Sequence, residues 1–370
     1  MAAFLTGGCS EGEPFGHPSA EREKRVEVTF RLEAVGTDVS LEPMTRATSY
    51  TQWFRNTARL LILKKADTRW IVDTTQTVLL DAQSGPWAEL KIAGDLPPCP
   101  FNLELRPGDY RIVAVINWGS ADWNNDLVPG KVVSDETDGS LRTPPLLTYT
   151  ISTHWMNNGY RQLSREVFVA VADFPVPKSG DLHSAGVPPV TLRAERRVAK
   201  FRVLLKDKPS PVNGFSFDMT AHTVQMLFTS KTEPFAEGID ALGGMYYGDP
   251  ALYELPCCMS TMGDFHSSGT ERYQMCQTNS TVFSPFVFAD PASELPIGIL
   301  DIDISGASGG YTYKTDQTFA RTLAASKISG IVFETTDTYD DSSSQIRIDV
   351  VEATDDAGNP ENAAALFDSF

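Results

Sequence analysis

The sequence lacks the features of membrane-spanning and nucleic-acid-binding proteins. No run of apolar residues approaches the 18 or so that would indicate a helix crossing a bilayer. Basic residues are scarce, since 31 Lys and Arg stand against 48 Asp and Glu for a formal net charge of −17. Because like charges repel, this balance argues against binding to nucleic acid or to an anionic membrane surface.

Catalytic and metal-binding motifs are also missing from the sequence. The five histidines are scattered without HExxH spacing, and the five cysteines form no CxxC or zinc pattern. There is no P-loop and no glycine fingerprint of a dinucleotide site. Residues 306–310, GASGG, match the nucleophile-elbow pattern, but the alternation that follows predicts a strand instead of the required helix. We therefore expect no enzymatic activity and no cofactor.

Short runs in which polar and apolar residues alternate dominate the chain, which also contains 27 Gly and 24 Pro as turn residues. Residues 25–33, RVEVTFRLE, alternate polar and apolar side chains without exception, which predicts a strand with one buried face. Similar runs recur along the chain, for example at residues 110–117, 198–205 and 297–304. Helical periodicity is scarce: residues 318–327 favour one short helix, and Asn359-Pro360-Glu361 resembles a helix start.

The proline-rich segment 174–189 predicts a linker between two series of strands. Two series of about seven short strands each predict an all-β fold built from two tandem β-sandwiches. We expect a leader and tether over residues 1–24, an N-terminal sandwich over 25–187 and a C-terminal sandwich over 188–370.

The N-terminus resembles the end of a bacterial lipoprotein signal. A short apolar run, MAAFLTGG, ends in small residues before Cys9, the position at which such proteins carry a lipid. The polar run after Cys9 suits a flexible tether. We expect lipidation at Cys9, and the alternative is a disordered segment with a chance cysteine. Four cysteines remain (Cys99, Cys257, Cys258 and Cys276), and their pairing stays open.

Three tryptophans flank a polar stretch in the first half of the chain. Trp118, Trp123 and Trp155 stand near amides and carboxylates, so they form a candidate surface for stacking on a glycan. The alternative is that all three pack in the core or at a sheet edge. The stretch 122–126, DWNND, has oxygen ligands at alternate positions but lacks the glycine and the closing glutamate of a calcium loop. We expect a solvated loop there and no metal site.

Several motifs, in their order along the chain, resemble the fimbrillin-like proteins of Bacteroidales, which build surface fimbriae. These are Cys9, the strand 26–32, the segment Thr45-Arg46-Ala47, the strand opening with Pro107-Gly108-Asp109-Tyr110, and residues 196–201, RRVAKF. The resemblance covers residues 1 to 230 or so. It implies two transthyretin-like β-sandwich domains and export through the periplasm to the outer membrane as a lipoprotein.

The resemblance also implies a mode of assembly. In shaft subunits of the family, a protease cuts after an arginine and removes the first strand, and Arg46, followed by Ala47, is the matching position here. Loss of the strand leaves unpaired backbone groups and an apolar groove that accept a strand from the next subunit. The apolar residues that fill this groove before cleavage are Val26, Val28, Phe30 and Leu32. The alternative is that this strand is a permanent part of the core.

We therefore expect a structural subunit of a cell-surface fimbria whose partners are other fimbrial subunits, in a homo- or hetero-polymer. The C-terminal segment 363–370, AAALFDSF, is a candidate donor strand. It equally suits a frayed end or a short helix. The alternative function is a non-polymerising surface lipoprotein or tip adhesin that binds a glycan or a host protein. In both cases the lipid anchor is the only contact with the outer membrane.

Overall fold

The computed structural model of the chain describes residues 25–35, 57–79, 99–116, 123–152, 160–162, 167–178, 187–206, 222–248, 252–260, 265–268, 271–275, 286–306, 312–315, 319–325, 328–340 and 345–351. Every regular element in these ranges is a β-strand, which confirms the all-β prediction. Among these residues the structure has no helix that is long and apolar enough to span a membrane.

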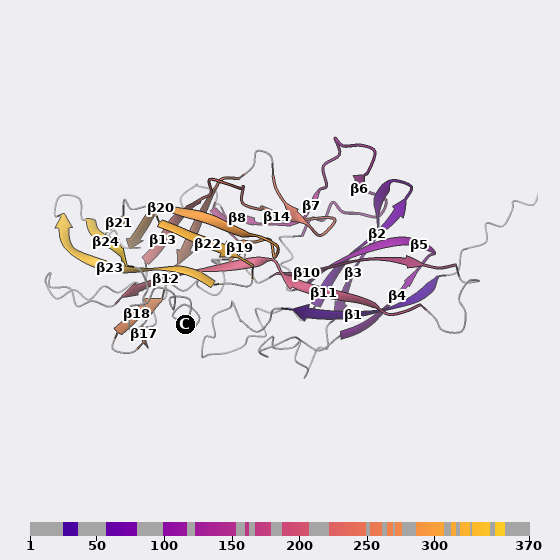
Figure 1. Cartoon of the computed structure of the whole chain (residues 1–370), viewed down its shortest axis with the longest axis horizontal. Coiled ribbons are helices and arrows are strands. Elements are labelled where there is room, and N and C mark those ends of the chain that lie inside the picture. Colours follow the sequence, from indigo (N-terminus) through magenta and orange to yellow (C-terminus); the bar gives the residue numbers. More distant parts are fainter. Residues whose placement is uncertain are drawn as a thin grey trace, which may run out of the picture.

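Eight strands form the first sheet, which lies toward one end of the molecule (Figure 1). Their spatial order is β4-β1-β11-β10-β5-β2-β3-β6. Their bounds are β1 (Val26–Val35), β2 (Thr57–Ala66), β3 (Arg69–Leu79), β4 (Cys99–Leu105), β5 (Gly108–Ile116), β6 (Val132–Asp135), β10 (Phe168–Val176) and β11 (Val190–Arg196).

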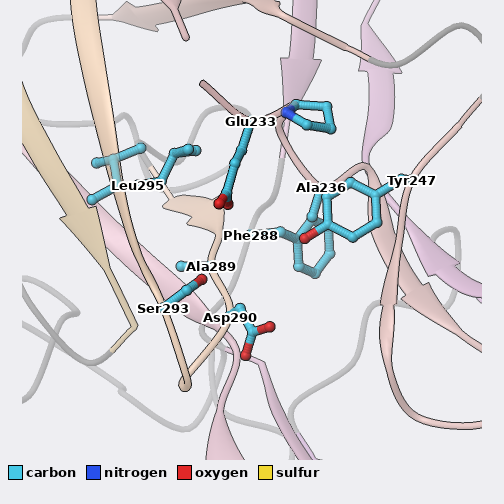
Figure 2. A pocket seen from close by; sticks show the side chains of 10 residues that line it. Glu233, Ala236, Tyr247, Phe288, Ala289, Asp290, Ser293 and Leu295 are labelled. Carbon is cyan, nitrogen blue, oxygen red and sulfur yellow. The ribbon is translucent and has the colours of Figure 1, made fainter. Parts of the chain in front are cut away.

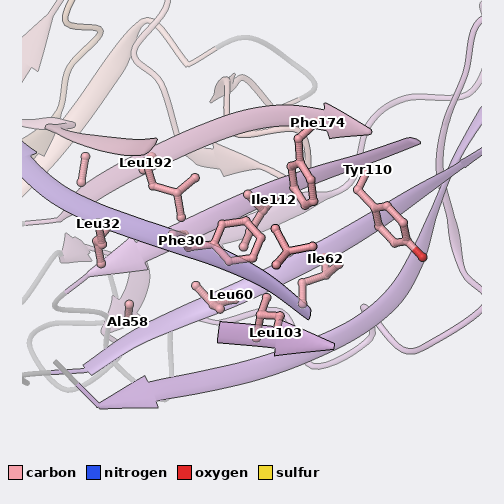
Figure 3. Packing of buried hydrophobic residues seen from close by; sticks show 14 of the residues in the cluster. Phe30, Leu32, Ala58, Leu60, Ile62, Leu103, Tyr110, Ile112, Phe174 and Leu192 are labelled. Atoms are coloured by element: carbon pink, nitrogen blue, oxygen red, sulfur yellow. The ribbon is translucent and has the colours of Figure 1, made fainter. Parts of the chain in front are cut away.

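The first sheet folds over on itself around one core. Strands β10 and β11 pair only at Phe168↔Arg196 and Val169↔Glu195. The group β4-β1-β11 therefore separates from the group β10-β5-β2-β3-β6, and buried residues of both groups share a single hydrophobic cluster (Figure 3). Phe30 of β1, Leu60 of β2 and Ile112 of β5 meet in this cluster. Two facing groups of strands around one core are typical of a β-sandwich.

The second sheet contains eleven strands and occupies the other end of the molecule (Figure 1). Nine of them follow the order β16-β13-β20-β21-β24-β23-β12-β18-β17, while β19 pairs with β12 and β22 pairs with β20. The bounds are β12 (Val198–Lys206), β13 (His222–Thr229), β16 (Glu254–Ser260), β17 (Phe265–Ser268), β18 (Glu271–Met275), β19 (Phe286–Phe288), β20 (Glu294–Gly306), β21 (Thr312–Thr315), β22 (Phe319–Ala324), β23 (Ile328–Asp340) and β24 (Gln345–Val351).

Two small sheets complete the described structure. Strands β7 (Pro145–Thr148), β14 (Gly238–Asp240) and β15 (Met245–Tyr246) form one of them, in the order β15-β14-β7. Strands β8 (Thr150–Ser152) and β9 (Tyr160–Gln162) form the other. The first of these joins segments that lie far apart in the sequence, because β7 precedes β11 while β14 and β15 follow β12.

The prediction of a short helix over residues 318–327 is wrong. Residues 319–324 form β22, which pairs with β20 from Ala324↔Glu294 to Phe319↔Ile299. A run this short carries too little periodicity to separate helix from strand, so an available edge in the sheet decides its structure.

The predicted linker is shorter than the sequence indicated, because β10 continues through Pro175 to Val176 and pairs with β5 along its whole length. Proline is tolerated there since β11 pairs with β10 only near its start, which leaves this part of the strand without a second ladder among the described residues. β11 itself lies in the first sheet, so the chain passes to the second sheet at Arg197. The division into two domains at residue 187 stays a prediction.

Asp135 ties β6 to the turn between β2 and β3. Its carboxylate accepts hydrogen bonds from Arg69 Nε (2.7 Å), Thr68 Oγ1 (3.0 Å) and the backbone N–H and hydroxyl of Thr137 (3.0 and 2.7 Å). These donors, those of Thr137 first and then that of Arg69, hold the pKa of Asp135 well below its usual range.

We expect Asp135→Asn to be destabilising at neutral pH and less destabilising in acid. A carboxyl whose pKa is lowered by folding contributes stability above its unfolded pKa of about 3.9, and this contribution is lost as the pH falls through the folded value. Urea unfolding midpoints of the variant and the parent chain should therefore move closer together as the pH is lowered from 7 to 2.5 or so. The exposed Asp126→Asn is the control. Curves that stay equally far apart at all pH values would contradict the assignment.

Candidate functional site

The candidate site is the place that β1 occupies between β4 and β11. Residues 26–32 pair antiparallel with Leu105–Cys99 of β4, and residues 30–35 pair in parallel with Val190–Glu195 of β11. Phe30, Arg31 and Leu32 are the residues with partners on both sides. β1 therefore holds together two strands that do not pair with each other.

One face of β1 lies fully inside the core, as its alternation predicts. The side chains of the four residues proposed to fill the groove are 0–5% exposed: Val26, Val28, Phe30 and Leu32. The alternate residues Glu27 and Arg31 are exposed on the outer face. There, Asn102 Nδ2 donates a hydrogen bond of 2.7 Å to Glu27. Such exposed polar contacts contribute little to stability, so burial of the inner face holds the strand in place.

Phe30 is the centre of an aromatic cluster that joins both halves of the sandwich (Figure 3). Its ring stacks on Phe101 of β4 with the centroids 5.2 Å apart, and it meets Phe174 of β10 edge-on at 5.2 Å. Tyr110 of β5 stacks on Phe174 at 5.9 Å. Offset-stacked and edge-on pairs of this kind add to the stabilisation from burial alone.

The free energy gained by burying the apolar face of β1 is large compared with the free energy of unfolding of a whole domain. Four fully buried apolar side chains at roughly 1.5–3 kcal/mol each amount to about 6–12 kcal/mol. The whole free energy of unfolding of a typical domain is about 5–15 kcal/mol. An empty groove is therefore a high-energy state that must either be refilled or unfold.

The segment between β1 and β2 covers residues 36–56 and carries the predicted cleavage position. Arg46 and Ala47 both lie outside the described residues. Cys9, Cys276 and the candidate donor segment 363–370 also fall outside them, and Cys257 and Cys258 are described only as backbone of β16. Because β1 ends at Val35 and β2 begins at Thr57, a cut after Arg46 would leave β1 bound only by its ladders and its packing.

Trp123 does not offer a surface for stacking on a sugar. Its side chain is 3% exposed, it bridges to Leu147, and the guanidinium of Arg59 lies 4.1 Å from the centre of its ring. This burial agrees with the alternative interpretation, in which the tryptophan packs in the core or at a sheet edge. Trp118 and Trp155 lie outside the described residues. The prediction of a glycan-binding surface therefore stays open for these two tryptophans.

The polar loop after Trp123 is closed by its own side chains. Asn124 Nδ2 donates to the carbonyl oxygen of Pro145 (2.8 Å), and Asn124 Oδ1 accepts from the N–H of Asp126 (3.0 Å). In the part of the chain that the structure describes, no three His, Cys, Asp or Glu side chains are grouped so that they could hold a metal ion.

A shallow hollow lies between β19 and the loop before β14 (Figure 2). Its volume is about 330 Å³, with the open mouth included. The carboxylates of Glu233 and Asp290 and the ring of Tyr247 line it, over a floor that includes Phe288. Burial, and then the charges of Asp290 and Glu233, raise the pKa of the Tyr247 hydroxyl. We assign no function to this hollow.

The hairpin of β14 and β15 was not predicted from the sequence, although its turn is recognisable there. Residues 240–244, DALGG, combine an aspartate with two glycines, a strong turn signal. Asp240 accepts hydrogen bonds from the backbone N–H of Leu242 (2.8 Å) and of Gly244 (2.9 Å). Burial raises the pKa of Asp240, while these hydrogen bonds counteract part of that rise.

No protein-family model and no curated protein matches the sequence of the chain. Among solved structures, the chain is similar to a candidate adhesin from Bacteroides ovatus, with a TM-score of 0.42 and 11% identity over 88% of this chain and 93% of that one. It is also similar to a candidate polysaccharide-binding protein from Bacteroides thetaiotaomicron, with a TM-score of 0.41 and 10% identity over 85% and 93% of the two chains.

A third similar structure is the fimbrial anchor protein Mfa2 from Porphyromonas gingivalis, with a TM-score of 0.40 and 11% identity over 88% of this chain and 97% of that one. The adhesin and the fimbrial anchor come from Bacteroidales, the group that contains the family named by the sequence resemblance. At such TM-scores the likenesses establish neither a shared fold nor a shared function.

Proposed function

We propose that this protein is a structural subunit of a cell-surface fimbria, without catalytic activity, that joins its neighbours by β-strand exchange. The observation that carries the proposal is the position of β1. It is the first strand among the described residues, its inner face is 0–5% exposed, and one segment carrying Arg46 connects it to β2. In this proposal the two halves of the chain are tandem transthyretin-like sandwiches, and Cys9 carries the lipid that tethers the exported subunit to the outer membrane.

The proposed mechanism follows from the large free energy gained by burying the apolar face of β1. Cleavage after Arg46 removes the covalent connection but not the ladders with β4 and β11. Because an empty groove is costly, β1 stays bound until a strand from another subunit pairs with the same edges and fills the same apolar positions. Exchange then replaces a contact within one subunit by a contact between two subunits, and the amount of buried apolar surface changes little. The C-terminal segment 363–370 is the proposed donor.

We expect brief treatment of the purified chain with an arginine-specific protease to give one main cut, after Arg46, followed by ladders that resist detergent without heating. Arg46→Gln should abolish both the cut and the ladders. Arg25→Gln is the matched control, because Arg25 directly precedes β1 and a cut there would leave β1 attached to β2. Mass spectrometry identifies the cut, and unheated gel electrophoresis measures the ladders. A cut chain that stays monomeric would contradict strand exchange.

We further expect the freshly cut chain to keep β1 bound. Native mass spectrometry should detect both fragments in one particle, and dilution into urea below the unfolding midpoint should release the N-terminal fragment only slowly, since its burial is worth roughly 6–12 kcal/mol. Immediate loss of the fragment in buffer would show that the ladders and the packing of β1 are far weaker than described.

The second candidate function is a non-polymerising surface lipoprotein or tip adhesin that binds a glycan or a host protein. The observation that favours it is the same burial, because a strand paired on both sides at Phe30, Arg31 and Leu32 is also what a permanent core strand requires. A chain that resists the protease, or that is cut without forming oligomers, would favour this role.

A further inference from the structure

The β14–β15 hairpin, which follows β12 in the sequence, is joined to β7 by backbone pairing and rests with its tip on the first sheet. Gly238 and Ile239 pair with Thr148 and Leu147 of β7, and the N–H of Ala241 donates to the carbonyl oxygen of Pro144 (2.9 Å). Figure 1 shows β14 beside β7, between the two large groups of strands. Ile239 and Ala241 are completely buried in this contact region. We call residues 238–246 the latch.

A second contact holds the same junction near the hollow. The hydroxyl of Tyr149, directly after β7, accepts a hydrogen bond of 2.7 Å from the backbone N–H of Phe288 in β19. The two rings also meet edge-on with centroids 4.7 Å apart. The contact is buried, so it fixes the end of β7 against the second sheet.

The tip of the latch, at Gly243, packs closely against the first sheet. Gly243 has a φ of +89°, and a Cβ atom at this position would clash with Cγ2 of Val171 in β10 and lie 3.4 Å from Cγ1 of Val113 in β5. A glycine is therefore required both by the turn and by the close approach. Gly238 has a similar role, since a Cβ atom there would strike the carbonyl oxygen of Leu147.

The latch and β1 lie on opposite faces of the same two strands. In β5, Ile112 and Ala114 belong to the cluster that buries β1, while the intervening Val113 faces the latch. In β10, Ala170 and Phe174 belong to that cluster, while Val171 meets Gly243. Successive side chains of a strand point to opposite faces, so β5 and β10 are in contact with β1 on one side and with the latch on the other.

We propose that the latch holds the two sheets together and that its hold depends on the occupancy of the β1 groove across β5 and β10. A filled groove fixes the positions of Ile112 and Phe174, and with them the surface of Val113 and Val171 on which the latch rests. Loss of β1 loosens that surface and releases the latch, so the two halves of the chain reorient only after the strand has left. This inference rests on the proposed function for its biological meaning, because there the release follows cleavage.

The coupling can be tested on the full-length, uncut chain by hydrogen–deuterium exchange. Phe30→Ala leaves a cavity on the β1 side of Phe174, and we expect amide exchange in residues 236–247 to become about tenfold faster, within the range usual for coupled sites. Val133→Ala is the control, because Val133 in β6 is equally buried but lies outside the β1 cluster. Phe30→Leu provides a milder cavity should Phe30→Ala fail to fold.

Linkage requires the reverse effect as well. Gly243→Ala should speed exchange in residues 26–32, while Gly130→Ala, at a glycine with a φ of +90° and nothing within 4 Å, should not. Unchanged exchange of the latch in the Phe30 variants, together with faster exchange in β4 and β11, would overturn the proposal. Since no cleavage is involved, this outcome is independent of whether Arg46 is cut and whether the chain polymerises.

Discussion

Replacing Phe30 by alanine is expected to lower the free energy of unfolding by about 3–5 kcal/mol, the usual cost of removing a fully buried phenylalanine. Its side chain is completely buried and contacts Phe101 and Phe174, so the cavity would lie between the two halves of the sandwich. Since the free energy of unfolding of a typical domain is about 5–15 kcal/mol, this loss would remove a large part of the stability. Urea unfolding followed by far-ultraviolet circular dichroism measures it.

The neighbouring Arg31→Ala is the matched control. Arg31 lies in the same strand with the same two partner strands, but its side chain is exposed. We expect a change within about 0.5 kcal/mol, as for most surface substitutions. Equal losses at the two positions would show that the ladder, and not the apolar face, holds β1 in its groove.

Gly243→Ala is expected to cost more than Gly130→Ala by about 1–3 kcal/mol, the usual penalty for forcing an extra methyl group into a packed contact. Both glycines have almost the same φ, +89° and +90°, so the backbone strain of alanine is matched. They differ in space, because a Cβ atom meets Val171 at the first position and nothing within 4 Å at the second. The difference therefore isolates the contact between the latch and the first sheet.

A double-mutant cycle with Val171→Ala tests the cause directly. Removing Cγ2 of Val171 takes away the clashing atom, so the combined variant should be more stable than the sum of the single changes predicts. Additive losses would place the cost of Gly243→Ala in the turn itself. Thermal unfolding of the four chains in parallel is sufficient for the comparison.

Local patterns predicted much of the fold because burial of one face of a strand leaves a direct trace in the sequence. The alternation of residues 25–33 predicted β1 and the face that it buries. The resemblance to fimbrillin-like proteins then drew attention to the same strand and to Arg46. Neither step depends on knowing which strands pair with which.

Apart from the β14–β15 hairpin, whose turn has a local signal, the features that the sequence did not predict depend on contacts between distant segments. β22 was expected to be a helix because its pairing with β20 has no local signal. β11 was assigned to the second half because only its parallel pairing with β1, far away in the sequence, places it in the first sheet. Trp123 was a candidate for ligand binding because the chain alone does not reveal that Arg59 lies over its ring.

The ladders on the two sides of β1 give the groove a direction. The strand runs parallel to β11 and antiparallel to β4, and these two kinds of ladder space their hydrogen bonds differently. A replacement strand inserted backwards would exchange the two patterns, so the groove favours a single orientation of its occupant. A polymer built by filling such grooves repeats one head-to-tail contact, and the resulting filament is polar, with two unlike ends of which one carries a groove still filled by its own β1.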